Sequence, residues 1–169
     1  MKNYSRRGFI ITGRQTPYKR FDLAVEACTK LNLPLVVIGN GPDHAKLEAM
    51  AGPSVIFMTS VNDEQLAMCL QSAAGFIFPT QDDFGIAAVE ALAAGTPVIA
   101  YKGGGALDYV VPGKTGVFFE QQTVDSLAKA LQNFRSDNFS THELRQAAQQ
   151  FSPEHFRTAM RHTLEEEFA

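Results

Sequence analysis

Short apolar segments alternate with amphipathic segments along most of this 169-residue chain. Six segments are apolar and short enough to be buried strands, at residues 9–12, 35–38, 55–58, 76–78, 98–101 and 117–119. Between and after them, apolar residues recur at helical spacing within residues 21–31, 45–50, 66–73, 86–93 and 124–134. Strands that are apolar on both faces and separated by helices form parallel sheets covered on both sides. The pattern predicts an α/β fold, a doubly wound, Rossmann-like parallel sheet.

The residues after 138 follow a different pattern, with helical spacing and no apolar strand. Ser152-Pro153 is typical of a helix start, and Phe156, Met160 and Leu164 then fall on one face. We predict a domain over residues 1–138 and C-terminal helices over residues 139–169. These helices either pack on that domain or cross to another one.

Composition is that of an ordinary soluble globular protein, with 45% hydrophobic and 20% charged residues. A net charge of −3 argues against a nucleic-acid partner. No apolar run approaches the ~18 residues of a membrane span, so we expect a cytoplasmic protein. The only cysteines, Cys28 and Cys69, fit buried thiols in a reducing compartment. The first twenty residues nevertheless hold six basic groups and no acid: Lys2, Arg6, Arg7, Arg14, Lys19 and Arg20.

Charged and small residues gather in the loops that follow the predicted strands, where doubly wound sheets bind ligands. Arg14 and Lys19 flank the loop after the first strand, and two such cations suit a diphosphate, although solvated surface cations would look the same. Gly39, Gly41 and residues 103–105 allow a ligand close to the backbone, or simply form turns. The dinucleotide and Walker-type glycine motifs are absent.

Two acids flank the start of the fourth predicted helix, whose N-terminus is an anion site. Asp82 precedes the helix and could instead be its N-cap. Glu90 lies one turn in, beside the apolar, sheet-facing side, where a carboxylate needs a partner or half-exposure to water. Ligands rich in hydroxyl groups suit both carboxylates. The histidines lack ligand spacing and an Asp-x-Asp motif is absent, so we expect no metal and no cofactor.

Taken in order, these segments resemble the carboxyl-terminal donor-binding half of the GT-B glycosyltransferases, in the retaining family 4 (group 1). The likeness runs from about residue 8 to 134. It is carried by Gly13-Arg14 with Lys19, Gly39-Asn40-Gly41-Pro42, Phe78-Pro79-Thr80, Asp83-Phe84-Gly85-Ile86, Val89-Glu90-Ala91-Leu92-Ala93-Ala94-Gly95-Thr96-Pro97-Val98-Ile99-Ala100, Gly103-Gly104-Gly105 and Gly113-Lys114-Thr115-Gly116.

The resemblance implies a role for each matching residue. Arg14 and Lys19 would hold the donor diphosphate, and Asp82 would touch the donor sugar as the first acid of a Glu-x7-Glu motif. Asp is one methylene shorter than Glu, so its reach differs; Thr59 and Asp108 also depart from the family pattern. Glu90 would bind the ribose, and backbone at Val61 and Asn62 the base. The implied donor-binding set is Gly13, Gly39, Gly41, Val61, Asn62, Phe84, Gly85, Ile86, Glu90 and Gly104.

The implied reaction is the metal-independent, retaining transfer of a hexose from a nucleoside diphosphate sugar to a glycan or lipid-linked acceptor, in polysaccharide biosynthesis. The wording around residues 83–86 and 104–107 resembles the mannosyltransferase-like branch, which points to a GDP-sugar, with a UDP-sugar open. The site would need an N-terminal acceptor domain or partner chain, through which it could touch a membrane peripherally. The chain alone is then expected to bind donor without transferring sugar.

Three alternatives share these motifs. A nucleotide-sugar binding module or regulatory subunit would carry the same donor-side residues. A sugar-nucleotide epimerase or a phosphorylase of the same fold is disfavoured by the spacing between Asp82 and Glu90. A non-catalytic interaction domain is disfavoured because Arg14, Lys19 and Glu90 occur together.

Overall fold

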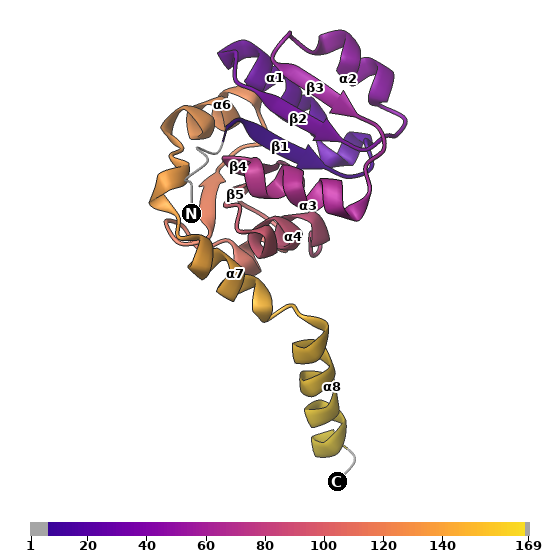
Figure 1. Cartoon of the computed structure of the whole chain (residues 1–169), viewed down its shortest axis with the longest axis vertical. Helices are drawn as coiled ribbons and strands as arrows, with labels where there is room; N and C mark the ends of the chain where they lie inside the picture. Colours follow the sequence, from indigo (N-terminus) through magenta and orange to yellow (C-terminus); the bar gives the residue numbers. More distant parts are fainter. Residues whose placement is uncertain (1–6, 168–169) are drawn as a thin grey trace.

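A six-stranded parallel sheet forms the centre of the computed structural model, which describes residues 7–167. The strand order is β3-β2-β1-β4-β5-β6, and every neighbouring pair is parallel (Figure 1). Each predicted strand is confirmed to within one residue at either end. The strands are β1 (Phe9–Thr12), β2 (Leu35–Ile38), β3 (Val55–Met58), β4 (Gly75–Phe78), β5 (Val98–Tyr101) and β6 (Gly116–Phe119).

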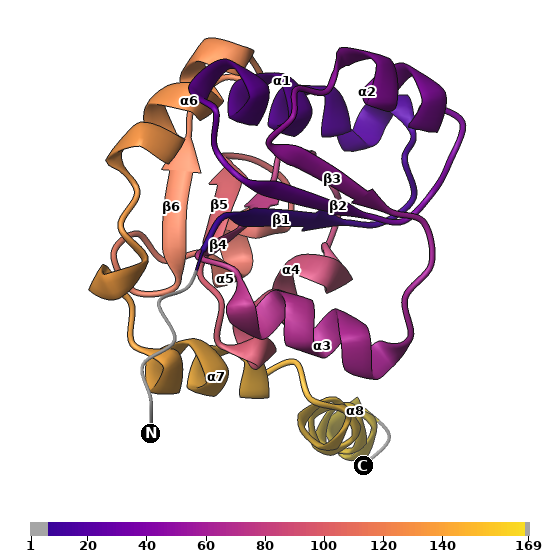
Figure 2. The same cartoon turned by 45° about the horizontal axis from the view of Figure 1, so that its top comes forward.

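Helices cover both faces of this sheet, as Figure 2 shows. One face carries α1 (Phe21–Leu31), α2 (His44–Met50) and α6 (Val124–Asn133). The other carries α3 (Asp63–Ser72), α4 (Ile86–Ala94) and α7 (Thr141–Gln149). The doubly wound α/β prediction is confirmed. The short helix α5 (Ala106–Tyr109) and the 3-10 turns η1 (Pro17–Lys19) and η2 (Ser136–Asn138) are additions that the sequence pattern did not predict.

The apolar character of the strands follows from the two hydrophobic cores, one on each face. In β1, Phe9 and Ile11 join the core under α1 and α6, whereas Ile10 joins the core over α4 and α7. Ile77 and Phe76 of β4 divide in the same way. A strand buried on both faces has no polar side, so polar and apolar residues do not alternate along it. These strands therefore appear in the sequence as unbroken apolar runs.

The two C-terminal helices differ in how they pack. Helix α7 buries Leu144 and Ala148 in the core beside α4. Helix α8 (Pro153–Glu167) extends away from the sheet (Figure 1), and its apolar side chains Phe156, Met160 and Leu164 are 61%, 45% and 50% exposed. Helix α7 therefore packs on its own domain, and packing of α8 on a further domain stays a prediction. Within residues 7–167, no helix has the length and apolarity needed to cross a membrane. Lys2 and Arg6, part of the basic start, lie outside the described residues.

The strand order creates one place where the direction of winding reverses. From β1 the chain moves outward through β2 and β3, then returns to place β4 on the other side of β1. Phe9 and Ile10 of β1 pair with Gly75 and Phe76 of β4. The loops after β1 and β4 consequently leave in opposite directions, and a crevice opens between them at the carboxyl edge of the sheet.

Candidate functional site

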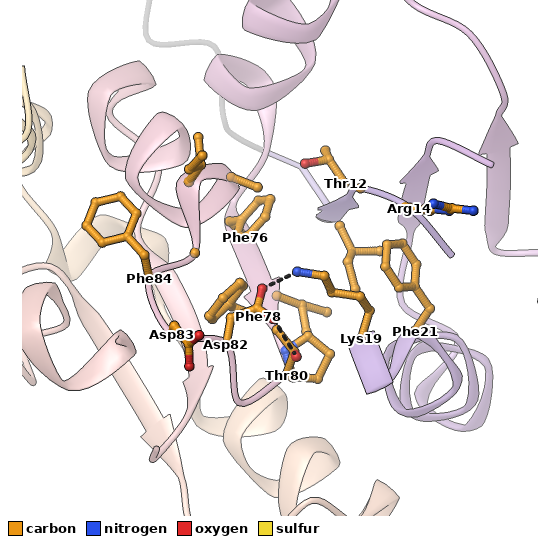
Figure 3. Close-up of a pocket in the computed structure, with 17 residues that line it drawn as sticks. Thr12, Arg14, Lys19, Phe21, Phe76, Phe78, Thr80, Asp82, Asp83 and Phe84 are labelled. Carbon is orange, nitrogen blue, oxygen red and sulfur yellow. Dashed lines mark hydrogen bonds and ion pairs between the residues drawn. The ribbon is translucent and has the colours of Figure 1, made fainter. Parts of the chain in front are cut away.

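A cavity of about 440 Å³ occupies this crevice. Its walls come from the end of β1, from η1, from the end of β4 and from the N-terminus of α4 (Figure 3). Of the predicted site residues, seven line it: Gly13, Arg14, Lys19, Asp82, Phe84, Gly85 and Ile86. The fold therefore gathers the predicted diphosphate and sugar residues at one point, from two loops that are about 65 residues apart in the sequence.

An ion pair between Lys19 and Asp82 spans the cavity (Figure 3). The single turn η1 carries Lys19 to one wall of the cavity, and the loop after β4 carries Asp82 to another. The two side chains are 25% and 16% exposed. Buried Thr80 steadies the arrangement, because its hydroxyl donates to the carbonyl of Tyr18 at 3.1 Å and lies 3.4 Å from Asp82 Oδ1. Lys19 and Asp82, which the motif assigns to the same sugar-nucleotide donor, thus contact each other directly.

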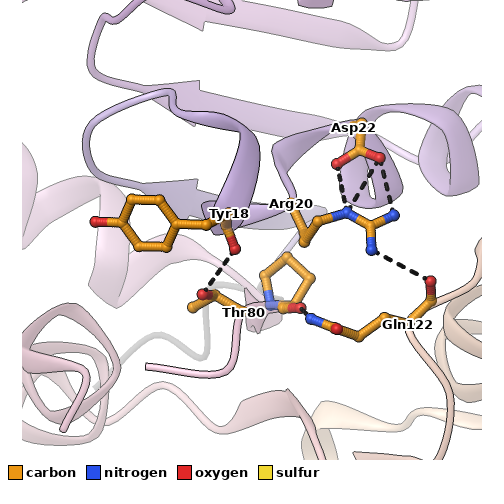
Figure 4. A network of polar contacts seen from close by, with 6 residues as sticks. Tyr18, Arg20, Asp22, Thr80 and Gln122 are labelled. Carbon is orange, nitrogen blue, oxygen red and sulfur yellow. Dashed lines mark hydrogen bonds and ion pairs between the residues drawn. The ribbon is translucent and has the colours of Figure 1, made fainter. Parts of the chain in front are cut away.

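A brace of polar contacts holds these loops in register, as Figure 4 shows. Arg20 adopts a left-handed backbone conformation with φ 55° at the start of α1 and pairs with Asp22 at 3.0 Å. Its Nη1 donates to the carbonyl of Gln122 at 3.5 Å, and Gln122 Nε2 donates to the carbonyl of Pro79 at 2.8 Å. The brace joins the loops after β1, β4 and β6 around the base of the cavity, and so it fixes the positions of η1 and Thr80.

Arg14 lines the same cavity from the β1 side but is exposed. Figure 3 shows its guanidinium directed away from the Lys19–Asp82 pair. Its neighbour Gly13 has φ 136°, a conformation that glycine adopts readily. Arg14 and Lys19 line the same cavity, but contact of both side chains with one diphosphate would require the Arg14 side chain to turn inward.

The N-terminus of α4 forms the third wall. Gly85 caps the helix with φ 90°, and a Cβ at this position would lie 2.5 Å from the hydroxyl oxygen of Tyr109 and 2.5 Å from the ring of Phe78. Only glycine fits that space and conformation. The first N–H groups of an α-helix lack intrahelical partners and carry the positive end of the dipole. With Gly85, Ile86 and Ala87 on the cavity wall, this end suits an anion.

Three glycines predicted to approach a donor do not line the cavity and instead pack against neighbouring loops. A Cβ on Gly39 would lie 2.1 Å from the carbonyl oxygen of Gly13, and one on Gly41 would lie 2.4 Å from that of Gln15. Gly104 has φ 59°, and its Cβ would lie 2.3 Å from the carbonyl oxygen of Asp82. These close backbone contacts bring the loops together, and they account for glycine at each position without a ligand.

Gln15 is a positioning residue that the sequence did not single out. It is fully buried, and its Nε2 donates to the carbonyl of Gly39 at 2.8 Å while its Oε1 lies 2.7 Å from Nδ1 of His44. Its backbone N–H donates to Asn40 and its carbonyl accepts from Asp43, at 3.0 and 3.1 Å. All of these partners come from the loop and helix after β2. A local sequence motif therefore could not predict this link between the loop after β1 and the loop after β2.

The remaining predicted residues, Val61, Asn62 and Glu90, do not line the cavity and belong to the start of α3 and to α4. Asn62 caps α3, since its side chain accepts from the N–H of Gln65 at 2.8 Å. Val61 packs at the margin of the core. Glu90, which we expect beside the sheet-facing side of α4 with either a partner or half-exposure to water, is exposed and borders a groove of about 570 Å³ between α4 and α7. Partial desolvation raises the pKa of Glu90, and the charge of nearby Asp63 raises this pKa further.

Within the described residues, no group of three or more His, Cys, Asp or Glu side chains could hold a metal ion. The absence of a cofactor stays a prediction.

The family of the chain follows from comparison with known sequences. A family model, Glycosyl transferases group 1, matches residues 2–151. The chain belongs to this family. It is 32% identical over 114 residues to the GDP-mannose-dependent alpha-mannosyltransferase of Mycolicibacterium smegmatis, covering 67% of the chain and 30% of that protein. It is also 32% identical over 149 residues to the D-inositol 3-phosphate glycosyltransferase of Streptomyces avermitilis, covering 76% of the chain and 32% of that protein. The chain spans about a third of the length of these group 1 relatives.

Solved structures confirm the GT-B assignment at the level of the fold. Sucrose-phosphate synthase from Thermosynechococcus elongatus superimposes with a TM-score of 0.82 at 24% identity, covering 98% of the chain and 46% of that structure. HepE of Anabaena, solved in complex with UDP-glucose, superimposes with a TM-score of 0.80 at 18% identity, covering 96% of the chain and 50% of that structure. This group 1 chain therefore has the Rossmann-like fold of one half of a GT-B glycosyltransferase.

Proposed function

We propose that the cavity between β1 and β4 binds the diphosphate of a nucleoside diphosphate sugar, as the donor site of a hexosyltransferase. The observation that carries the proposal is the placement of Lys19 opposite the N-terminus of α4, at the point where the sheet reverses its winding. An anion between them would meet an ammonium group on one side and unpaired helix N–H groups on the other. Arg14 is within the same wall and adds a second cation when its side chain turns inward.

The chemistry that this arrangement would support is departure of the nucleoside diphosphate. As the bond between the anomeric carbon and the diphosphate breaks, negative charge grows on the leaving oxygens. Lys19, Arg14 and the N–H groups of Gly85 and Ile86 would stabilise that charge without a metal ion. Asp82, beside Lys19 on the cavity wall, would contact the sugar hydroxyls. Transfer with retention at the anomeric carbon is part of the proposal.

The nucleoside would extend from the cavity across the N-terminal end of α4 toward α3. Glu90 and Asp63 face each other there closely enough for Asp63 to affect the pKa of Glu90. A ribose offers two hydroxyl donors to Glu90, and the backbone at Val61 and Asn62 would meet the base. Relatives that use GDP-mannose, such as the Mycolicibacterium smegmatis enzyme, make GDP-mannose the first donor to test and UDP-glucose the second.

Transfer to an acceptor would need a second domain, because the group 1 relatives are about three times as long as this chain. The exposed apolar face of α8, formed by Phe156, Met160 and Leu164, is the surface that we assign to that contact. The proposal places the whole protein in the cytoplasm, acting on a glycan or lipid-linked acceptor for polysaccharide biosynthesis, with membrane contact made through the second domain.

Isothermal titration calorimetry with GDP and with UDP tests the donor site. Wild-type chain should bind at least one of them, and Lys19→Ala should weaken that binding by tenfold or more, since a charge-assisted hydrogen bond is worth about 1.5–3 kcal/mol. Lys129→Ala, at an exposed position of α6, is the matched control and should bind as wild type does. Equal affinity in Lys19→Ala and wild type would reject the site. Mixing the chain with a candidate second domain, GDP-mannose and a glycan or lipid-linked acceptor then separates a transferase from a donor-binding module, because only a transferase yields a glycosylated acceptor.

A further inference from the structure

The hydroxyl of Tyr109 is a buried polar group without a hydrogen-bond partner among the described residues. Tyr109 ends the short helix α5 and is 1% exposed, with its ring packed edge-on against Phe84 and Phe151. Buried hydroxyls nearly always have a partner, because leaving one unpaired opposes folding. We therefore expect the Tyr109 hydroxyl to have a hydrogen-bond partner in another state of the protein, such as the ligand-bound one.

This hydroxyl lies against the loop that carries Asp82. The space that a Cβ on Gly85 would take is only 2.5 Å from the Tyr109 oxygen, and Gly85 lines the cavity. The Asp82 backbone is tied to the same region, since its carbonyl accepts from the N–H of Gly105 at 2.8 Å, one residue before α5 begins. Burial raises the pKa of Tyr109, and the charges of Asp82 and then Asp108 raise this pKa further. Tyr109 is thus a neutral donor within the field of the Asp82 carboxylate.

Asp82 has to change partners when the proposed ligand binds. Its carboxylate now pairs with Lys19, the cation that a diphosphate would take. A carboxylate only 16% exposed loses most of its solvation, so release from Lys19 leaves it in need of a hydrogen-bond donor. Thr80 cannot serve fully, because its hydroxyl already donates to the carbonyl of Tyr18.

We propose that Tyr109 is a positioning residue for the donor site, whose hydroxyl donates to the Asp82 carboxylate once a nucleoside diphosphate has displaced it from Lys19. This inference rests on the proposed function. Asp82 then has two positions, one against Lys19 in the empty site and one against Tyr109 in the occupied site. In the second position, Asp82 would leave Lys19 to the diphosphate while staying at the cavity wall where the sugar is expected.

Tyr109→Phe tests the inference because it predicts opposite effects on stability and on binding. Without nucleotide, the variant loses only an unpaired hydroxyl, so its thermal midpoint should rise by about 2–4 °C, equivalent to about 1 kcal/mol for a chain of this size. Its affinity for GDP or UDP, measured by calorimetry, should fall about tenfold because Asp82 has lost its second partner. Tyr101→Phe, at the end of β5 with its ring against Phe119, is the matched control and should leave binding unchanged.

A double-mutant cycle decides whether Tyr109 acts through Asp82. In the Asp82→Ala background, Tyr109→Phe should change the affinity by less than about twofold, because the proposed partner is gone. A tenfold loss that persists in that background, or an unchanged affinity in Tyr109→Phe alone, would overturn the inference while leaving the donor site in place. A fall in the nucleotide-free midpoint would also overturn it, since the hydroxyl would then have a partner in the empty protein. A wild-type chain that binds neither GDP nor UDP would overturn the proposed function, and the inference with it.

Discussion

Replacing Asp82 with Asn should make the chain bind a nucleoside diphosphate more tightly. In the empty site, Lys19 is paired with Asp82, and the two side chains are 25% and 16% exposed. This exposure lies between that of a surface pair, worth at most about 1 kcal/mol, and that of a buried one. A contribution of about 1.4 kcal/mol is the resulting order of magnitude, and it corresponds to tenfold in binding. Asp82→Asn keeps the shape of the side chain and removes its charge, so GDP or UDP no longer has to displace an anion.

Calorimetry with GDP and UDP measures the effect directly. Asp82→Asn should bind about tenfold more tightly, and its thermal midpoint without nucleotide should fall by about 2–4 °C because the ion pair is lost. Asp83→Asn is the matched control: it removes the same charge from an exposed side chain on the same cavity, so screening should limit its effect to less than about twofold. Equal tightening in both variants, or unchanged affinity in Asp82→Asn, would refute the idea that Asp82 and the diphosphate compete for Lys19.

Three further perturbations test separate parts of the account. Gly85→Ala forces a side chain into the left-handed backbone region and against Tyr109, so it should lower the free energy of unfolding by about 3 kcal/mol in a urea titration. A loss below about 1 kcal/mol would mean that the loop after β4 can shift to make room for the methyl group. Glu90→Gln should raise the thermal midpoint at pH 7 but not at pH 4, because an acid whose pKa is raised above its ordinary 4.5 in the folded state disfavours folding once it ionises; a pH-independent difference contradicts this. Burial raises the pKa of Cys28 to about 12, so this thiol should react with a disulfide reagent at pH 8 only after unfolding, and rapid reaction in the native chain would show that α1 opens readily.

The fold could be predicted from the sequence because its signals are local. Apolar runs of four residues and helical spacing are visible within a window of a dozen residues, and all six strands were placed to within one residue. Helix α5 was missed because four residues of Ala-Leu-Asp-Tyr after three glycines show no period. Seven of the residues predicted for the site line the cavity, since parallel strands deliver their following loops to one edge of the sheet.

Contacts between distant loops could not be predicted in the same way. Lys19 and Asp82 are 63 residues apart, and they meet only because β1 and β4 are neighbours in the sheet. The buried links of Gln15 and the unpaired hydroxyl of Tyr109 depend equally on which loops the strand order brings together. Glycines that the motif assigns to a ligand, such as Gly39, turn out to make room for another loop. Sequence spacing does not distinguish these two reasons for glycine.

A crystal structure of the chain with GDP, or with UDP if that nucleotide binds more tightly, tests the central claim most directly. The account predicts the diphosphate between the Lys19 ammonium and the N-terminus of α4, with phosphate oxygens within hydrogen-bond distance of Lys19 Nζ and of the N–H groups of Gly85 and Ile86, and with Asp82 no longer paired to Lys19. A nucleotide bound elsewhere, for example in the groove between β6 and α6, with the Lys19–Asp82 pair intact, would contradict it.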